Sequence, residues 1–193
     1  MTFRLSSALA NRFIHLDLEV DPEDWHAWAV GRGIIPEVTA FIKYRPALLQ
    51  ASSEGEQAFA TPRSWEMVSD VVKKFGSPKD ARDVIPGIIG SGPAVEFQTF
   101  AKKSVLRKEI DAILADPAGA PVPSELDRLW VLVSFLTADA ENDAVRQASL
   151  TLLPRLPVEF GVVLVRDMIR RVPAIVREKR ITDYIKANKV VLM

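Results

Sequence analysis

The first pattern along the chain is a short alternation of apolar and polar side chains. Residues Phe13 to Val20, FIHLDLEV, alternate imperfectly and are rich in β-branched and aromatic side chains. These features are typical of a half-buried strand, so the sequence predicts one short β-strand here. Because one strand cannot form a sheet, its partners must lie in another chain or in a missing part of this protein, or it pairs with nothing.

After this strand the apolar residues recur at helical spacing. Asp21 and Pro22 have the chemistry of an N-cap and a first helical position. Thr61 and Pro62 open another helix in the same way, which places Arg63 in its first turn. Six helices are expected with clear bounds: Asp21 to Gly33, Pro36 to Arg45, Thr61 to Phe75, Asn142 to Leu153, Val158 to Arg171 and Ala174 to Asn188. A broken helix is expected around Pro86, and another helix begins after a cap at Ser124. A longer helical region runs from Pro93 to Asp116, and the sequence does not decide whether it is interrupted near Ser104.

The same spacing predicts which side chains of these helices face a core. Apolar residues three and four positions apart share one face of a helix, and that face is buried when the helix packs. The residues expected to share such faces are Trp25, Trp28 and Ala29, then Val38, Phe41 and Ile42, then Trp65, Val68, Val72 and Phe75, and then Leu126, Leu129, Trp130 and Val133. The fold class predicted from these patterns is mainly α.

A change in composition divides the helical part of the chain. The segment from Asp116 to Pro123, DPAGAPVP, has the glycine and prolines typical of a linker. We therefore expect a helical subdomain over residues 21–116 and a second one over residues 117–193, preceded by the segment 1–20.

Composition limits the classes of partner. The 193 residues include 25 basic and 25 acidic side chains, so no overall electric field directs the protein to a nucleic acid or a membrane. The absence of cysteine excludes disulfides, thiolate zinc sites and cysteine nucleophiles, and it fits a reducing cytoplasm. Apolar stretches fall far short of the roughly 20 residues that span a bilayer, and no signal peptide is recognisable. We expect a cytoplasmic protein without a membrane partner.

Most local motifs favour structure over chemistry. No G-x-x-x-x-G-K-[ST] phosphate-binding loop occurs, and the glycines at 87, 90 and 92 are interpreted as a hinge between helices. His15 and His26 lack the spacing of metal ligands, so no metal site is expected and both are interpreted as structural. Among the acids between Asp17 and Asp24, those from Asp21 to Asp24 are explained by helix capping and the helix dipole, and the whole group is interpreted as a solvated acidic rim.

A basic carboxyl-terminal segment leaves a nucleic-acid partner open as a weaker alternative. Residues 166–189 hold eight basic and three acidic side chains. Such a segment is typical of a solvated helical face, and no interleaved aromatic residues suggest base stacking.

One combination of motifs carries a resemblance to a known family. It comprises Leu5 to Val20 (LSSALANRFIHLDLEV), Trp25 with Trp28 and Ala29, Gly33 to Val38 with Phe41, Arg45 with Pro46, and Thr61 to Glu66 (TPRSWE). In this order and at this spacing, the motifs resemble the second half of a MoxR-type AAA+ ATPase. The resemblance covers roughly residues 3 to 105.

The resemblance implies a role for each part of the chain. Residues 1–20 would be the remnant of the AAA+ core, ending its last helix and forming its final strand. Residues 21–116 would be the helical lid, and residues 117–193 a carboxyl-terminal helical subdomain. Walker A, Walker B and the sensor 1 strand would all precede residue 1. The chain would therefore not hydrolyse ATP alone.

The resemblance also implies two functional arginines. Arg12 would be the arginine finger that reaches a neighbouring subunit's γ-phosphate; Asn11 belongs to the same element, and Arg4 is a second, less favoured candidate. Arg63 would be the sensor 2 arginine of the lid. A guanidinium suits both roles because it is always charged and forks onto phosphate oxygens. The alternatives are that Arg12 pairs with an acid near the strand and that Arg63 is a surface or capping arginine.

The function implied is the nucleotide-sensing and oligomer-contact portion of an ATPase that remodels partner proteins. In the complete ATPase the cofactors would be ATP and Mg²⁺, with none expected for this chain alone. The partners would be other AAA+ subunits in a ring and an unknown client protein. The alternative is a stand-alone helical adaptor that binds a protein or peptide and never meets nucleotide.

Overall fold

The structure is a computed structural model that describes residues 9, 11–16, 19–51, 57–103 and 107–188. The described residues are mainly α-helical, as predicted. They form ten α-helices and three short 3₁₀ helices. These are α2 (Pro22–Arg32), α3 (Pro36–Tyr44), η1 (Pro46–Leu48), α4 (Pro62–Phe75), α5 (Pro86–Ile89), α6 (Ser91–Lys103), α7 (Arg107–Ala115), α8 (Leu126–Ala138), α9 (Asp143–Leu152), η2 (Leu153–Arg155), α10 (Val158–Arg171), η3 (Pro173–Arg177) and α11 (Lys179–Ala187).

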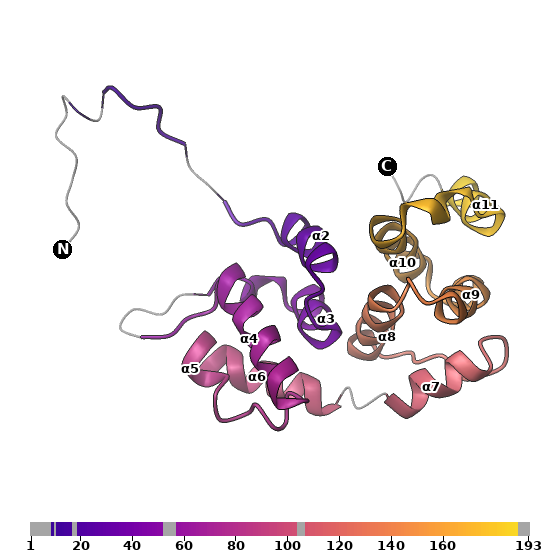
Figure 1. The fold of residues 1–193 in the computed structure, drawn as a ribbon, viewed down its shortest axis with the longest axis horizontal. Coiled ribbons are helices and arrows are strands. Elements are labelled where there is room, and N and C mark those ends of the chain that lie inside the picture. Colours follow the sequence, from indigo (N-terminus) through magenta and orange to yellow (C-terminus); the bar gives the residue numbers. More distant parts are fainter. Residues whose placement is uncertain (1–8, 10, 17–18, 52–56, 104–106, 189–193) are drawn as a thin grey trace.

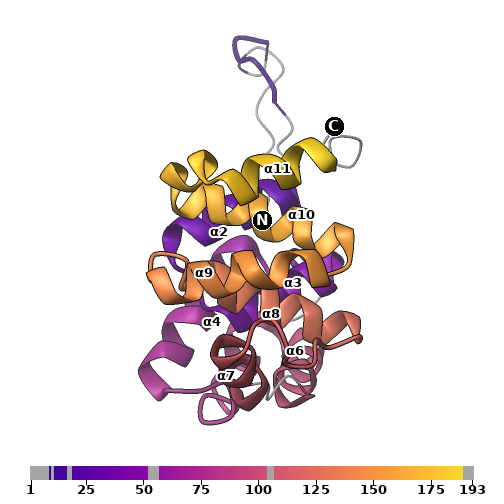
Figure 2. The ribbon, with the colours of Figure 1, turned by 90° about the vertical axis from the view of Figure 1, so that its right-hand side faces the viewer.

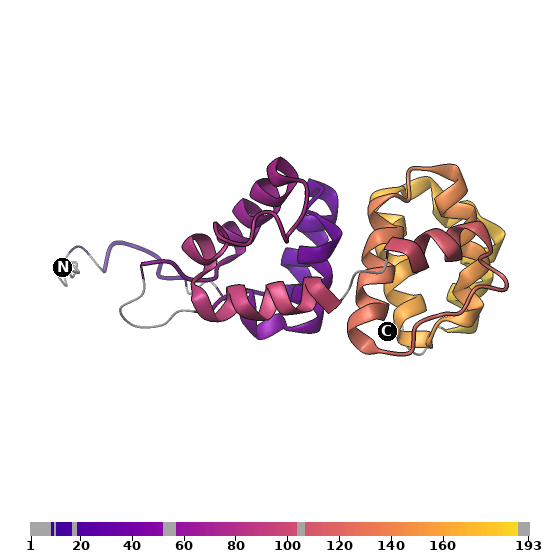
Figure 3. The same ribbon diagram turned by 90° about the horizontal axis from the view of Figure 1, so that it is seen from below.

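The helices are arranged in two groups that face each other (Figures 1 and 3). The first group contains α2 to α6, and the second contains α7 to α11. Helix α3 packs along α8, and α2 packs against α10, so these four helices form the interface between the groups. Figure 2 is seen from the side of the second group and shows α9 and α11 in front, on the face turned away from α2 and α3.

Helix α7 precedes the predicted linker but packs against a helix that follows it. Its contacts include α9, and Figure 3 shows it beside the carboxyl-terminal helices. The predicted boundary between residues 116 and 117 stays a prediction. In space, residues 107–115 belong with the second group.

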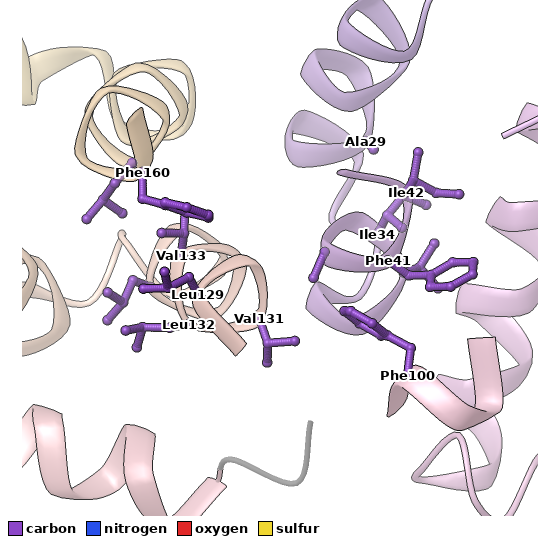
Figure 4. Packing of buried hydrophobic residues seen from close by; sticks show 14 of the residues in the cluster. Ala29, Ile34, Phe41, Ile42, Phe100, Leu129, Val131, Leu132, Val133 and Phe160 are labelled. Atoms are coloured by element: carbon purple, nitrogen blue, oxygen red, sulfur yellow. The ribbon is translucent and has the colours of Figure 1, made fainter. Parts of the chain in front are cut away.

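Aromatic side chains fill the centre of the first group. The ring of Phe41 lies 5.4 Å from each of the rings of Trp65, Phe97 and Phe100, measured between centroids. Such pairs contribute about 0.5–1.5 kcal/mol each beyond the burial of their area. The indole Nε1 of Trp65 donates to the carbonyl of Leu48 at 2.8 Å, so its polar atom is also satisfied. Figure 4 shows Phe41 and Phe100 on one side of the interface.

The second group contributes its own apolar side chains to the same buried cluster. Leu129, Leu132 and Val133 of α8 lie inside this group, close to Phe160 of α10 (Figure 4). Val131 points from the opposite face of α8 toward the first group and is fully buried. Burial on both faces of α8 explains why this helix has a nearly continuous apolar sequence, because only a helix covered on two sides buries apolar residues all round.

The ends of several helices follow from local chemistry, as predicted. The carboxylate of Asp21 accepts from the backbone N–H groups of Glu23 and Asp24 at 2.7 and 2.9 Å, which caps α2. Helix α4 begins with a capping box in which Thr61 and Ser64 exchange side-chain and backbone hydrogen bonds. It ends at Gly76, whose φ of +90° is a conformation that glycine adopts without steric cost.

Two predicted helices differ from the structure. The helix expected to be capped by Ser124 begins at Leu126, and Glu125 is its N-cap residue. The helix expected over 174–188 is divided into η3 and α11, with Glu178 extended between them. Ile175 and Ile181 are both buried. Six positions apart they would point in different directions on one continuous helix, so the break at Glu178 lets both reach the core.

The β-strand predicted over Phe13 to Val20 is not confirmed in the described residues. Residues 13–16 and 19–20 have no strand structure, and residues 17–18 lie outside the described part. A strand is stable only when its backbone pairs, and the β-bridge in the described residues joins Ala51 to Ala60 instead. Figure 1 shows the described residues before α2 extending away from both groups, and Phe13, Ile14 and Leu16 are exposed.

Candidate functional site

Arg63 occupies the second position of α4, immediately after the capping box. Its side chain is exposed, and among the described residues it has no hydrogen bond or ion pair. The indole Nε1 of Trp25, in the first turn of α2, donates to the carbonyl of Pro62 at 3.3 Å. This bond places the amino-terminal turns of α2 and α4 side by side. Arg63 therefore lies at the end of the first group where the segment preceding residue 21 joins it.

The position of Arg63 is electrostatically unfavourable for a lone cation. The amino terminus of a helix carries a partial positive charge from its unpaired N–H groups, and it attracts anions. A guanidinium in the first turn adds a like charge to this end. The pair of charges is stabilised when an anion binds between them, and a phosphate group has the size and charge to do so.

The remaining predicted site residues lie in the amino-terminal segment. Arg12 and Asn11 are both exposed, and the backbone N–H of Arg12 donates to the carbonyl of Leu9 at 3.0 Å. Within the described residues, Arg12 forms no ion pair with an acid. Arg4 lies outside the described residues. The structure does not bring Arg12 into contact with Arg63, and Figure 1 shows the segment around Arg12 apart from α4.

A buried pair of ionisable side chains joins the two groups. The Nε2 atom of His26 in α2 lies 2.7 Å from Oδ2 of Asp167 in α10, and the two side chains are only 4 and 2% exposed. Arg166 Nε and Arg170 Nη1 lie 3.4 and 3.2 Å from the other carboxylate oxygen. His26 is therefore buried and hydrogen bonded, as the structural interpretation predicted.

The charges around Asp167 determine its ionisation. Burial alone would raise the pKa of Asp167, but the hydrogen bond from His26 and the positive charges of Arg166 and Lys43 outweigh burial and lower the pKa. The carboxylate is therefore ionised near neutral pH and accepts hydrogen bonds. It follows that the Nε2 atom of His26 carries the proton and donates it.

A second ion pair continues this cluster toward the surface. The Glu23 carboxylate receives Lys43 Nζ at 2.5 Å on one oxygen and Arg166 Nη2 at 2.9 Å on the other. Burial raises the pKa of Glu23, but the hydrogen bond and charge of Lys43 and the charge of Arg166 outweigh it and lower the pKa. Burial lowers the pKa of Lys43, which Glu23 only partly offsets. The Lys43 ammonium also lies 6.0 Å from the centre of the Trp130 ring in α8.

This charged cluster, comprising Glu23, His26, Lys43, Arg166, Asp167 and Arg170, connects α2 and α3 to α10. Removing one partner of a buried ion pair costs about 3–5 kcal/mol, because the other charge is left without compensation. The cluster therefore restricts how the two groups of helices can sit against each other.

Sequence reasoning missed most of this cluster. In the sequence alone, the helix dipole explains Glu23, and the basic charge of Arg166 and Arg170 is typical of a solvated face. The available signal was Asp167 itself: a single acid lies between Arg166 and Arg170 in a helix whose other face is apolar. That pattern indicates a compensated carboxylate, but it does not identify His26 as the partner from 141 positions away.

Membrane, metal and family comparisons add no site to this description. Within the described residues, no helix has both the length and the apolar character needed to cross a bilayer. In the same residues, no three His, Asp or Glu side chains are grouped so that they could hold a metal ion. Comparisons of the chain with protein-family models, with curated proteins and with solved structures find no match.

Proposed function

We propose that this chain is the lid, nucleotide-sensing and oligomer-contact portion of a MoxR-like AAA+ ATPase that remodels partner proteins. The observation that carries the proposal is Arg63, an exposed guanidinium in the first turn of α4 that has no partner among the residues the structure describes. It is held beside the start of α2 by the bond between Trp25 and Pro62. A sensor arginine must stand where the lid meets the ATPase core, and the amino-terminal segment joins the lid at this end.

The amino-terminal segment supports the same proposal. Phe13, Ile14 and Leu16 are apolar yet exposed, in a sequence with the composition of a strand. Exposed apolar side chains that lie close together mark surfaces that another element normally covers. In the complete ATPase the strand over residues 13–20 pairs at the end of the core sheet, and Arg12 stands just before it as the arginine finger.

The adaptor alternative assigns no phosphate-binding role to the arginines. A stand-alone adaptor needs neither Arg12 nor Arg63 for a phosphate, and it would leave both as ordinary surface residues. The two functions are separated first by the reading frame upstream of codon 1. A Walker A motif in frame with this sequence supports the ATPase, and an upstream region without one favours the adaptor.

The purified chain should not act on ATP by itself. Two arginines without a phosphate-binding loop provide only a few charge-assisted hydrogen bonds, each worth about 1.5–3 kcal/mol. The entropy lost on association consumes most of this free energy. Calorimetric titration should therefore detect no tight binding, and micromolar affinity for ATP in this chain alone would contradict the proposal.

The complete ATPase then tests the two arginines separately. Arg12→Ala should abolish turnover and leave the affinity for ATP nearly unchanged, because an arginine finger acts on a neighbour's nucleotide and is worth about 10³–10⁵ in rate. Mixing this variant with a Walker-defective subunit should restore part of the activity across the interface. Arg63→Ala should weaken ATP binding, lid closure or both.

A matched control is Arg82→Ala, which removes another exposed arginine of the same group, one whose described ion pair is with its neighbour Asp83. This variant should keep wild-type kcat/KM and ATP affinity. If Arg12→Ala or Arg63→Ala also keeps both values, the arginine concerned is structural. If both do, the proposed function is wrong.

A further inference from the structure

A cavity of about 240 Å³ lies at the interface between the two groups of helices. Its walls come from α2, α3, α8 and α10, with one residue from the end of α4. Several lining residues are apolar, and the others bring polar atoms together. The polar and charged lining residues are His26, Thr39, Lys73, Ser134, Thr137, Asp167 and Arg171.

Three polar atoms of these lining residues are buried without a hydrogen bond in the described part of the chain, and one of them, Nε of Arg171, instead forms an ion pair with Glu141 at 3.1 Å. The other two are Nδ1 of His26 and Oγ1 of Thr137, and both residues are only 3% exposed. Buried polar atoms without a partner are uncommon, and each requires an explanation. Their occurrence together in the wall of one cavity points to a molecule that hydrogen bonds to both.

The chemistry of these two atoms is complementary to a hydroxyl and an acceptor oxygen. His26 donates from Nε2 to the ionised Asp167, and when the ring carries its single proton on that nitrogen, Nδ1 offers a lone pair that accepts a hydrogen bond. The hydroxyl of Thr137 can donate, as can that of Ser134 one turn earlier in α8. A molecule that fits must therefore offer a donor to His26 and an acceptor to the threonine.

The charges around the cavity favour an anion. Lys73 Nζ donates to the carbonyl of Gly33 at 2.7 Å, and an ammonium has two further hydrogens to donate. Arg171 bonds to the carbonyl of Val30 and pairs with Glu141, and it adds a second cation to the wall. The carboxylate of Asp167 is already compensated by the arginines beside it. Lys73 Nζ also lies 3.9 Å from Asp70, so both cations have an acidic partner outside the lining, and the lining itself holds two cations and one carboxylate.

We propose that this cavity binds a small oxyanion that also carries a hydroxyl group, such as hydrogenphosphate or a 2-hydroxycarboxylate. The hydroxyl donates to Nδ1 of His26, and the anionic oxygens accept from Thr137 and Lys73. The site is independent of the arginine sites, since about 15 Å of helix separates Lys73 from Arg63 along α4.

Four probes test this proposal by NMR titration of the purified chain. Inorganic phosphate and glycolate both have a hydroxyl group near neutral pH, whereas sulfate and acetate are similar oxyanions without one. Phosphate or glycolate should produce saturable shifts of the resonances of the lining residues. Phosphate should bind at least about tenfold tighter than sulfate, or glycolate at least about tenfold tighter than acetate, because the probe without a hydroxyl loses one buried hydrogen bond. The probe that binds tighter identifies phosphate or carboxylate as the oxyanion.

The Nδ1 resonance of His26 provides a direct reading in the wild-type protein. It should move when phosphate or glycolate binds, because the nitrogen then accepts a hydrogen bond. Thr137→Val should weaken binding by about tenfold while keeping the shape of the side chain. Lys73→Met should weaken it further, and the matched control Lys74→Met, one position along α4 and outside the lining, should leave it unchanged.

Three results would overturn the proposal. The first is the absence of any saturable shift with all four probes. The second is equal binding within each matched pair, which would show a general attraction of anions without a role for the hydroxyl. The third is equal weakening by Lys73→Met and Lys74→Met. If a variant fails to fold, as circular dichroism would show, the His26 resonance in the wild-type protein still decides the outcome.

Discussion

Replacing Asp167 by asparagine should destabilise the protein by about 2–4 kcal/mol. The side chain keeps its shape but loses the charge that His26, Arg166 and Arg170 surround. Loss of the charge-assisted bond with His26 costs about 1.5–3 kcal/mol, because both side chains are almost fully buried. The arginines are 34 and 37% exposed, so solvent screening limits the loss from each to less than about 1 kcal/mol.

Urea unfolding monitored by circular dichroism measures this difference in the free energy of unfolding. The matched control is Asp183→Asn, an exposed acid of α11 without an ion pair in the described residues, which should change stability by no more than about 0.5 kcal/mol. A double-mutant cycle with His26→Gln should give a coupling energy close to the loss assigned to their bond. An Asp167→Asn variant as stable as the Asp183→Asn control would refute the reasoning.

The same cluster predicts how stability depends on pH. Asp167 and Glu23 both have a lowered pKa in the folded protein. Their contribution is therefore present above the unfolded pKa of about 4 and is lost as pH falls through the folded values. The free energy of unfolding should decrease on acidification below that pH, and Asp167→Asn should flatten this dependence. An unchanged acid slope in the variant would show that Asp167 does not contribute to it.

Two further predictions concern the backbone and the amino-terminal segment. Gly76→Ala should destabilise the protein by about 1–2 kcal/mol, because φ is +90° at this position. Gly31→Ala inside α2 should stabilise the protein by about 0.5–1 kcal/mol, because alanine favours a helix more than glycine does. An added Cβ meets open space at both positions, so equal changes in the urea midpoint would contradict this explanation. The exposed apolar side chains of Phe13, Ile14 and Leu16 should cause concentration-dependent self-association that Ile14→Asp reduces; light scattering that shows a strict monomer of the wild-type chain at all concentrations would exclude it.

Local sequence chemistry predicted where helices begin and end better than it predicted which side chains are buried. Caps such as Asn142 and stops such as Gly76 act within a few residues, so they can be recognised without knowing the fold. Trp28, Phe75 and Leu126 were expected on inward faces but are 44, 50 and 60% exposed. Helical spacing shows which residues share a stripe, but only the packing of neighbouring helices determines how far along the stripe burial extends.

The candidate sites also divide into features that a local motif predicts and features that depend on the packing of distant helices. Arg63 could be placed in a first helical turn from the Thr-Pro-Arg motif alone, because that signal is local. The pairing of His26 with Asp167 and the cavity beside Thr137 depend on α2 meeting α10 and α8, which no short motif encodes. The strand predicted over residues 13–20 also depends on distant packing, since a strand requires a partner strand and the sequence of these residues does not identify one.

The interface formed by α2, α3, α8 and α10 makes the helical part of the chain a lever. The helical part is connected to the amino-terminal segment at one point, just before Pro22. The buried side chains and the ion pairs across the interface keep one group of helices from sliding on the other. A small rotation at this pivot therefore turns α2 to α11 together. Displacement grows with distance from the pivot, so a modest change of angle at the start of α2 becomes a larger stroke at α7 and α9.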